Sequence, residues 1–157
     1  MMHLSIPGRG QYQLHHLVLD LNGTLALDGR LLEGVADRLH VLGKHLVPVI
    51  LTADTHGGAS QVRAELGVEV VVLEAGRDEA VQKLETVQRL GAERVVAIGN
   101  GANDALMLKE AALGICVLGP EGTATEALLG ADVVVPDICQ AFDLLLSPQR
   151  LVATLRR

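Results

Sequence analysis

The chain has 157 residues, of which 49% are apolar, with one Phe, one Tyr, no Trp and a formal net charge of −6. This length suits a single domain with a sizeable core of Leu, Val, Ile and Ala. Because aromatic side chains are scarce and the net charge is negative, base-stacking platforms and basic phosphate-binding surfaces are excluded, and no nucleic-acid partner is expected.

Two hairpin signals flank the first long apolar run. Residues 1–15 contain two short extended runs around residues 7–10 (PGRG), which predicts an N-terminal β-hairpin. The dipeptide Asp28-Gly29, within residues 24–32, predicts a second hairpin.

From residue 16 onward, strand-like apolar runs alternate with amphipathic stretches. The apolar runs are continuous, as in parallel strands that are buried on both faces. Strands are expected at residues 16–20, 46–51, 68–73, 94–98, 114–118 and 132–135. Helices are expected at residues 33–43, 56–66, 78–91, 104–112, 122–130 and 137–146, and a terminal helix within 147–157.

This alternation predicts an α/β fold, a doubly wound three-layer sandwich around a mainly parallel sheet. We expect a single domain over residues 1–157, made of the hairpin 1–15, a core over 16–146 and the terminal helix 147–157.

The sequence shows no sign of a membrane or secretory segment. No stretch approaches the roughly 20 apolar residues of a membrane span, and the first residues lack a signal-peptide core. Cys116 and Cys139 lie in apolar stretches without metal-ligand spacing. These features are typical of a cytoplasmic protein with reduced cysteines and no membrane contact.

Polar residues occupy the carboxyl ends of the expected strands, where ligands of open parallel sheets bind. Asp20 ends the first strand and Thr52 follows the second, while the fourth leads into the loop GNGAND, residues 99–104. Lys83 lies in the helix before that strand. These positions predict a polar site at one edge of the sheet.

Each of these residues also has an ordinary structural explanation. Asp20 could end a strand at a turn, Thr52 could cap a helix, Lys83 could be solvated, and Asp104 could favour a helix dipole. Their joint order along the chain favours a site. His56 lies near this site in the sequence, although exposure at a helix start is its default interpretation.

Four segments in this order, DLNGTL, LTADT, Lys83 and GNGANDALML, resemble the motifs of the haloacid dehalogenase (HAD) superfamily. The last segment is particularly similar to a loop of P-type ATPases, so the chain resembles a soluble, free-standing phosphorylation domain of such a pump. The resemblance covers about residues 16–136 and implies a HAD-like Rossmannoid fold.

The resemblance also implies roles for individual residues. Asp20 would be the nucleophile that forms an aspartyl phosphate, and the catalytic set would include Asn22, Thr52 and Lys83. The residues implied to bind phosphate are Gly23, Thr24, Thr52, Ala53, Lys83 and Asn103.

A metal ion follows from the same resemblance. Mg²⁺ prefers oxygen ligands and would separate the site's carboxylates from a phosphate dianion. The implied metal ligands are Asp20, Asn22, Asn100 and Asp104.

Two of these positions depart from the family pattern. Asn22 replaces the usual second Asp of the first motif, and an amide cannot provide general acid–base catalysis, which is typically worth ~10²–10⁴ in rate. Asn100 replaces an acidic residue, so Mg²⁺ affinity should be lower. P-type pumps also lack an acid at the position of Asn22 and still form an aspartyl phosphate.

We therefore expect a slow phosphohydrolase or phosphotransferase that favours acyl or aryl phosphates. The alternative is a catalytically degenerate HAD domain that binds a phosphorylated ligand or partner protein without turnover.

Neither insertion point, residues 24–32 or 53–82, has room for a cap domain. A capless site is open to solvent, which suits a macromolecular substrate or a lid supplied by a neighbouring subunit. This layout resembles that of the capless ulosonate-phosphate phosphatases. The hairpin 1–15 is our candidate subunit contact in a homo-oligomer.

Overall fold

The computed structural model of the chain describes residues 1–54 and 57–157. Its central sheet consists of β3 (His16–Asp20), β6 (Val47–Thr52), β7 (Glu69–Val72), β8 (Val95–Gly99), β9 (Leu113–Val117) and β10 (Val133–Val135). Neighbouring strands are parallel, in the order β10-β9-β8-β3-β6-β7. The predicted strands are confirmed with small shifts at their ends.

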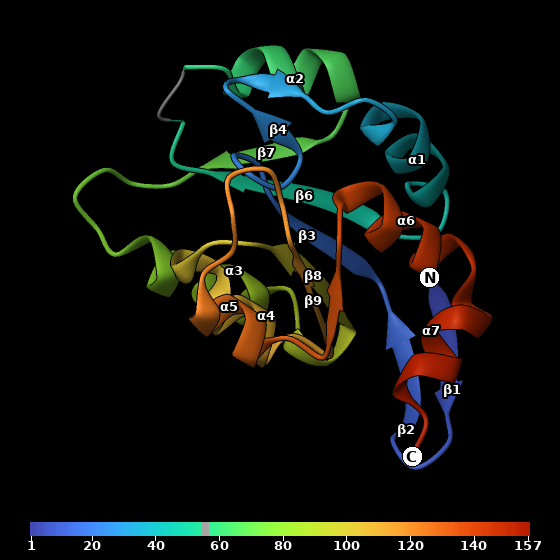
Figure 1. Cartoon of the computed structure of the whole chain (residues 1–157). Coiled ribbons are helices and arrows are strands. Elements are labelled where there is room, and N and C mark those ends of the chain that lie inside the picture. Colours follow the sequence, from blue (N-terminus) through green and yellow to red (C-terminus); the bar gives the residue numbers. More distant parts are fainter. Residues whose placement is uncertain (55–56) are drawn as a thin grey trace.

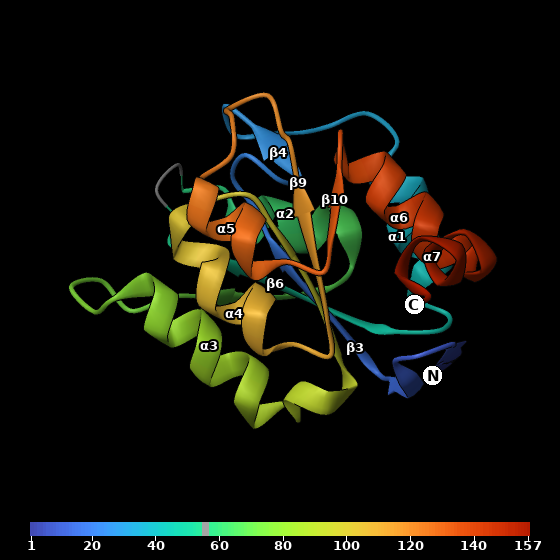
Figure 2. The ribbon, with the colours of Figure 1, turned by 60° about the horizontal axis from the view of Figure 1, so that its bottom comes forward.

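Helices cover both faces of this sheet. One face carries α1 (Val35–Leu42), α2 (Ala59–Leu66) and α6 (Ile138–Leu146), and the other carries α3 (Glu79–Arg89), α4 (Ala105–Glu110) and α5 (Thr125–Gly130). Figures 1 and 2 show these two groups on opposite sides of the strands, with α7 (Pro148–Leu155) beside α6. The predicted three-layer α/β sandwich is confirmed.

The alternation of side chains along β3 explains the two apolar layers. Leu17 and Leu19 pack into a cluster with α1, α2, α6 and α7, while Val18 packs into a second cluster with α3, α4 and α5. All three side chains are fully buried. A strand buried on both faces must be apolar at every position, which is why the run in the sequence is continuous.

Side-chain caps fix the starts of two helices. Asp78 accepts a hydrogen bond from the N–H of Val81, and Asp137 accepts one from Gln140, at 3.1 and 2.9 Å. These bonds satisfy N–H groups that have no partner within the helix.

The N-terminal hairpin packs on its own chain. β1 (Met2–Ile6) and β2 (Gly10–Leu14) pair antiparallel, and the alternate residues of β1 are buried against the core. The N–H of Arg157 donates to the carbonyl of Pro7, so the hairpin also lies against the C-terminal segment (Figure 1). The predicted hairpin is confirmed, and its role as a subunit contact stays a prediction.

The second predicted hairpin is also present. β4 (Ala26–Leu27) and β5 (Arg30–Leu31) pair antiparallel around Asp28 and Gly29, both of which have a positive φ. It is a small hairpin, and no cap domain occurs between β3 and α1.

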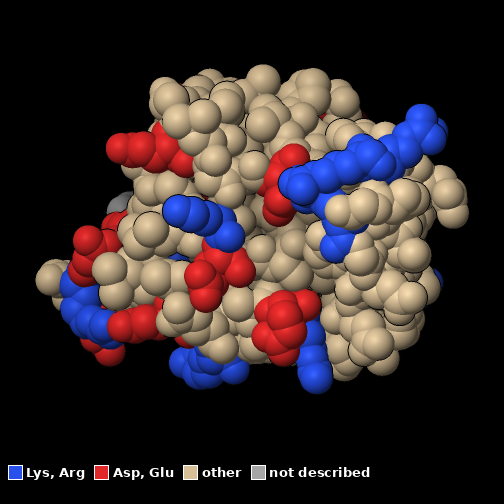
Figure 3. Space-filling model, turned by 90° about the horizontal axis from the view of Figure 1, so that it is seen from below, with Lys and Arg blue, Asp and Glu red and all other residues tan. Residues whose placement is uncertain are grey.

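The helices are short, and the charged side chains are mixed on the surface. Among the residues that the structure describes, no helix has the length and apolar character required to cross a bilayer. Acidic and basic side chains are interspersed on the face that Figure 3 shows.

The strand order places a crevice at the end of β3. The chain runs from β3 outward through β6 and β7, then returns to add β8, β9 and β10 on the other side. Open α/β sheets bind ligands where the strand order reverses in this way. The carboxyl ends of β3, β6 and β8 therefore position the site described next.

Candidate active site

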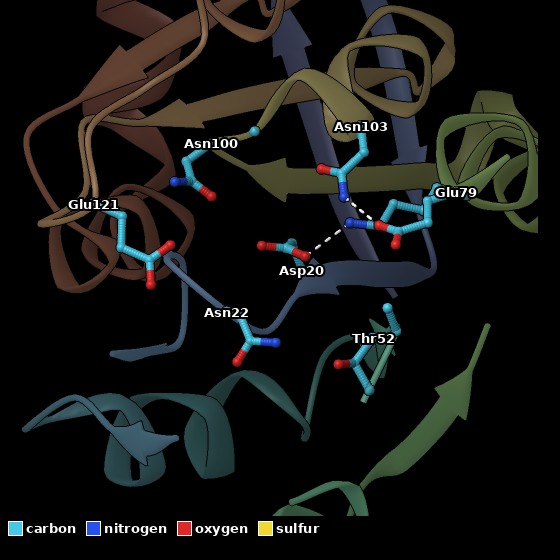
Figure 4. A pocket seen from close by; sticks show the side chains of 10 residues that line it. Asp20, Asn22, Thr52, Glu79, Asn100, Asn103 and Glu121 are labelled. Atoms are coloured by element: carbon cyan, nitrogen blue, oxygen red, sulfur yellow. Dashed lines mark hydrogen bonds and ion pairs between the residues drawn. The ribbon is translucent and has the colours of Figure 1, made fainter. Parts of the chain in front are cut away.

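A pocket of about 250 Å³ lies at the carboxyl ends of the strands (Figure 4). It is lined by Asp20, Asn22, Thr52, Ala53, Glu79, Lys83, Asn100, Gly101, Asn103 and Glu121. The structure thus brings most of the predicted site residues to one pocket. The other predicted residues, Gly23, Thr24 and Asp104, are buried and are not part of the lining.

The turn after β3 fixes Asp20 at the edge of the pocket. The carbonyl of Leu21 accepts hydrogen bonds from the N–H groups of Leu25 and Ala26, at 2.9 and 3.0 Å. Gly23 has φ +80°, and a methyl group at its Cα would lie 2.6 Å from Oε2 of Glu121. The positive φ favours glycine at this position.

Lys83 is buried between two carboxylates. Its Nζ lies 2.8 Å from Oδ1 of Asp20 and 2.6 Å from Oδ1 of Asp104, and its side chain is 1% exposed. Burial alone would lower the pKa of Lys83, but the two carboxylates outweigh it and the pKa is raised. Lys83 is therefore a fixed positive charge, rather than a solvated side chain.

Asp20 and Asp104 are two buried carboxylates beside one buried ammonium group, that of Lys83. Burial and the negative charge of Asp104 raise the pKa of Asp20 to about 6, against the opposing effect of Lys83. Two carboxylates thus share one ammonium group. This excess negative charge favours a cation in the adjoining pocket.

Asp104 lies behind the pocket and holds the loop after β8. Its Oδ2 accepts hydrogen bonds from the N–H groups of Asn100 and Gly101, at 3.0 and 2.9 Å, while its Oδ1 contacts Lys83. Sequence analysis assigned Asp104 to the metal. Because Asp104 is fully buried and does not line the pocket, we expect it to position Lys83 and the loop, and its binding of a metal stays a prediction.

Thr24 links Asp20 to Asn100. Its Oγ1 lies 3.0 Å from Oδ2 of Asp20 and 3.0 Å from Oδ1 of Asn100. A hydroxyl group has one proton and cannot donate fully to both acceptors. Two close oxygen acceptors that share one donor are a suitable partial ligand set for a hard cation.

The backbone of this turn is not available to phosphate. The N–H of Gly23 donates to Ala26 and that of Thr24 to Leu21, at 2.8 and 3.3 Å. Sequence analysis assigned both residues to phosphate, and the phosphate site proposed below omits them.

Thr52 lines the pocket and also accepts a hydrogen bond from the backbone that follows β6. Its Oγ1 accepts a hydrogen bond from the N–H of Asp54 at 3.0 Å, and its own proton stays available to a ligand. The Asp54 carboxylate in turn accepts from the N–H of Ala59 at 2.8 Å, at the start of α2. Asp54 thus supplies an acceptor for the first N–H group of α2. Thr55 and His56 lie outside the described residues.

Two carboxylates in the pocket, Glu79 and Glu121, were not among the predicted site residues. Glu79 lies one helical turn before Lys83 and accepts a hydrogen bond from Nδ2 of Asn103 at 2.6 Å (Figure 4). Glu121 follows β9. The spacing of four residues from Lys83, and the position after a strand, were available signals for Glu79 and Glu121 respectively.

No group of three or more His, Cys, Asp or Glu side chains suited to a metal ion occurs in residues 1–54 and 57–157. The pocket lining does supply carboxylate oxygens from Asp20, Glu79 and Glu121 and amide oxygens from Asn22, Asn100 and Asn103.

The sequence profile of haloacid dehalogenase-like hydrolases matches residues 5–112, which include Asp20, Thr52, Lys83 and Asp104. The chain belongs to this family. Its HAD motifs therefore occupy the strand ends and the helix that the resemblance implied.

Relatives by sequence include small and large proteins. An uncharacterised protein of Methanocaldococcus jannaschii is 49% identical over 82 residues, which cover 50% of this chain and 88% of that protein. Copper-transporting ATPase 2 of Rhizobium meliloti is 41% identical over 100 residues, which cover 61% of this chain and 11% of the pump. The HAD chain thus corresponds to a small part of the ATPase.

Solved structures show the same fold. The 3-deoxy-D-manno-octulosonate 8-phosphate phosphatase of Moraxella catarrhalis, solved with magnesium, phosphate and KDO, has a TM-score of 0.66 and 19% identity, and the match covers 91% of this chain and 94% of that one. A zinc-transporting PIB-type ATPase in the E2.Pi state has a TM-score of 0.63 and 27% identity, over 78% and 20% of the two chains. The chain is therefore a HAD hydrolase with the fold of a phosphatase.

Proposed function

We propose that this HAD hydrolase is a Mg²⁺-dependent phosphohydrolase or phosphotransferase in which Asp20 accepts the phosphoryl group. The observation that carries the proposal is the position of Asp20, which lines the pocket at the end of β3 and is held by Lys83 at 2.8 Å. A nucleophile fixed beside a buried cation suits attack on a phosphate.

Asp20, Lys83, Thr52 and Asn103 have separate roles in the proposed phosphoryl transfer. A carboxylate oxygen of Asp20 bonds to phosphorus, while the bond from phosphorus to the leaving oxygen breaks and its electron pair departs with that oxygen. Lys83 offsets the charge on the phosphoryl group, and Thr52 and Asn103 donate hydrogen bonds to its oxygens. Water then cleaves the acyl phosphate in the hydrolase, or a second acceptor takes the group in the transferase.

The proposed cation ligands are Asp20, the backbone carbonyl of Asn22 and Oδ1 of Asn100. The shared hydroxyl proton of Thr24 supports this set, because Asp20 and Asn100 both retain capacity to bind a cation. When bound, Mg²⁺ would neutralise charge on the phosphoryl oxygens and polarise the bond to phosphorus.

Asn22 limits the choice of substrate. Its amide lines the pocket beside Asp20, where it can donate a hydrogen bond but cannot transfer a proton to a leaving group. Acyl and aryl phosphates leave as stable anions without that proton. We therefore expect these substrates, carried by small molecules or by a protein, to react faster than alkyl phosphates.

The proposal predicts Mg²⁺-dependent turnover of para-nitrophenyl phosphate and acetyl phosphate. We expect the Asp20→Ala variant, and the wild type in EDTA, to show only background rates, because the nucleophile or the cation is then missing. The measurement is steady-state release of nitrophenol or phosphate.

The second candidate function is a domain that binds a phosphorylated ligand without turnover, and the neutral residues Asn22 and Asn100 favour it. Equal rates for the wild type and Asp20→Ala with Mg²⁺ would contradict the enzyme and support this binding domain.

A further inference from the structure

Glu121 brings a carboxylate to the same part of the pocket as Asn100. A methyl group on Gly23 would lie 2.6 Å from Oε2 of Glu121, and 2.8 and 3.2 Å from Nδ2 and Oδ1 of Asn100. The carboxylate and the amide are therefore close neighbours above the turn that follows Asp20. Figure 4 shows both on the opposite side of Asp20 from Glu79.

The side chain of Asn100 holds the loop that carries Glu121. Its Nδ2 donates a hydrogen bond to the carbonyl of Gly122 at 3.0 Å, and its backbone carbonyl accepts one from the N–H of Ala124 at 2.9 Å. An aspartate at position 100 has no N–H to donate to Gly122. Compared with an aspartate, Asn100 therefore lacks a negative charge but makes a hydrogen bond that holds the neighbouring loop.

The other charged groups of the pocket already have partners. Lys83 contacts Asp20 and Asp104, and Glu79 accepts from Asn103. Glu121 is exposed and makes no hydrogen bond or ion pair with any described residue. Its charge is thus available to a ligand in the pocket.

We propose that Glu121 is the second anionic group of the divalent-cation site, in the place of the charge that Asn100 lacks. The inference rests on the proposed function, because the cation is the one proposed there. In this arrangement the second negative charge lies on the loop between β9 and α5 rather than at the end of β8, and the Asn100 amide helps to set the position of that loop.

The test is the Mg²⁺ affinity of the full chain, measured by isothermal titration calorimetry without substrate. We expect Glu121→Gln to raise the Kd by about 10- to 100-fold, the usual cost of losing a group that supports a metal site. Glu126→Gln is the matched control, since Glu126 lies on α5 and does not line this pocket. It should leave the Kd unchanged.

A charge-relocation variant sharpens the test. Asn100→Asp combined with Glu121→Gln returns the carboxylate to the end of β8, and we expect it to restore most of the affinity that Glu121→Gln loses. Metal-free thermal unfolding of Glu121→Gln should match the wild type, because the side chain is exposed and makes no hydrogen bond or ion pair with a described residue.

Asp20→Asn separates the two proposals. If Asp20→Asn weakens Mg²⁺ binding while Glu121→Gln and Glu126→Gln both match the wild type, the role of Glu121 is overturned and the proposed function stands. A normal Kd with slower breakdown of the acyl phosphate in Glu121→Gln would also overturn it, since Glu121 would then act on water. If the wild type binds no Mg²⁺, the proposed cation site fails, and the inference fails with it.

Discussion

Replacing Asn22 with Asp is expected to raise Mg²⁺-dependent hydrolysis of an alkyl phosphate by about 10²-fold or more, the usual contribution of a general acid–base group. Asn22 lines the pocket beside Asp20, so a carboxylic acid there could protonate a leaving oxygen and then activate water. The measurement is kcat for an alkyl phosphate and for acetyl phosphate, and the gain should be larger for the alkyl substrate.

Asn103→Asp is the matched control for this gain. It makes the same near-isosteric change in the same pocket, but it places a carboxylate against Glu79, which now accepts from Asn103 at 2.6 Å. We expect no gain in rate from this variant. A folded Asn22→Asp variant that is no faster than the wild type would show that position 22 is not the acid–base position.

Lys83→Met is expected to lower the free energy of unfolding of the metal-free protein by about 3–5 kcal/mol, because it leaves two buried carboxylates without their cation. A loss of this size corresponds to about 10 °C in Tm for a domain of this length. The measurement is thermal and urea unfolding in EDTA. Unchanged stability would contradict the buried charge arrangement around Lys83.

The Asp20→Asn variant should have a higher free energy of unfolding than the wild type, the opposite of the change expected for Lys83→Met. Because the folded protein raises the pKa of Asp20 from 3.8 to about 6, ionised Asp20 destabilises the fold, and this destabilisation grows as the pH rises between those values. Above this window, metal-free Asp20→Asn should be more stable than the wild type by about 1–3 kcal/mol. Below it, both forms carry a neutral side chain and the difference should disappear.

The fold could be predicted because its pattern is local. Continuous apolar runs specify strands that are buried on both faces, and β3 begins and ends at the predicted residues. The start of α2 was predicted near residue 56 but lies at Ala59. Asp54 adopts a positive φ and accepts a hydrogen bond from the N–H of Ala59, five residues away, a conformation that periodicity does not reveal.

The site was only partly predictable, because its roles depend on side-chain direction. Asp20 and Thr52 could be predicted because ligands of open parallel sheets bind at the carboxyl ends of the strands. Lys83 was predicted from the family resemblance. Spacing alone could not show that Asp104 turns back toward Lys83 and the loop backbone. Glu121 was missed because its approach to Gly23 depends on a loop held by Asn100, and that contact is made only in three dimensions.

Fluorine NMR of beryllofluoride, an analogue of the phosphoryl group, tests most directly whether Asp20 is the phosphoryl acceptor. With saturating Mg²⁺, the wild type should give a bound fluorine resonance that Asp20→Asn lacks, while Glu126→Gln, which lies outside the pocket lining, should retain one. Absence of a bound resonance in the wild type, or an identical one in Asp20→Asn, would contradict the account.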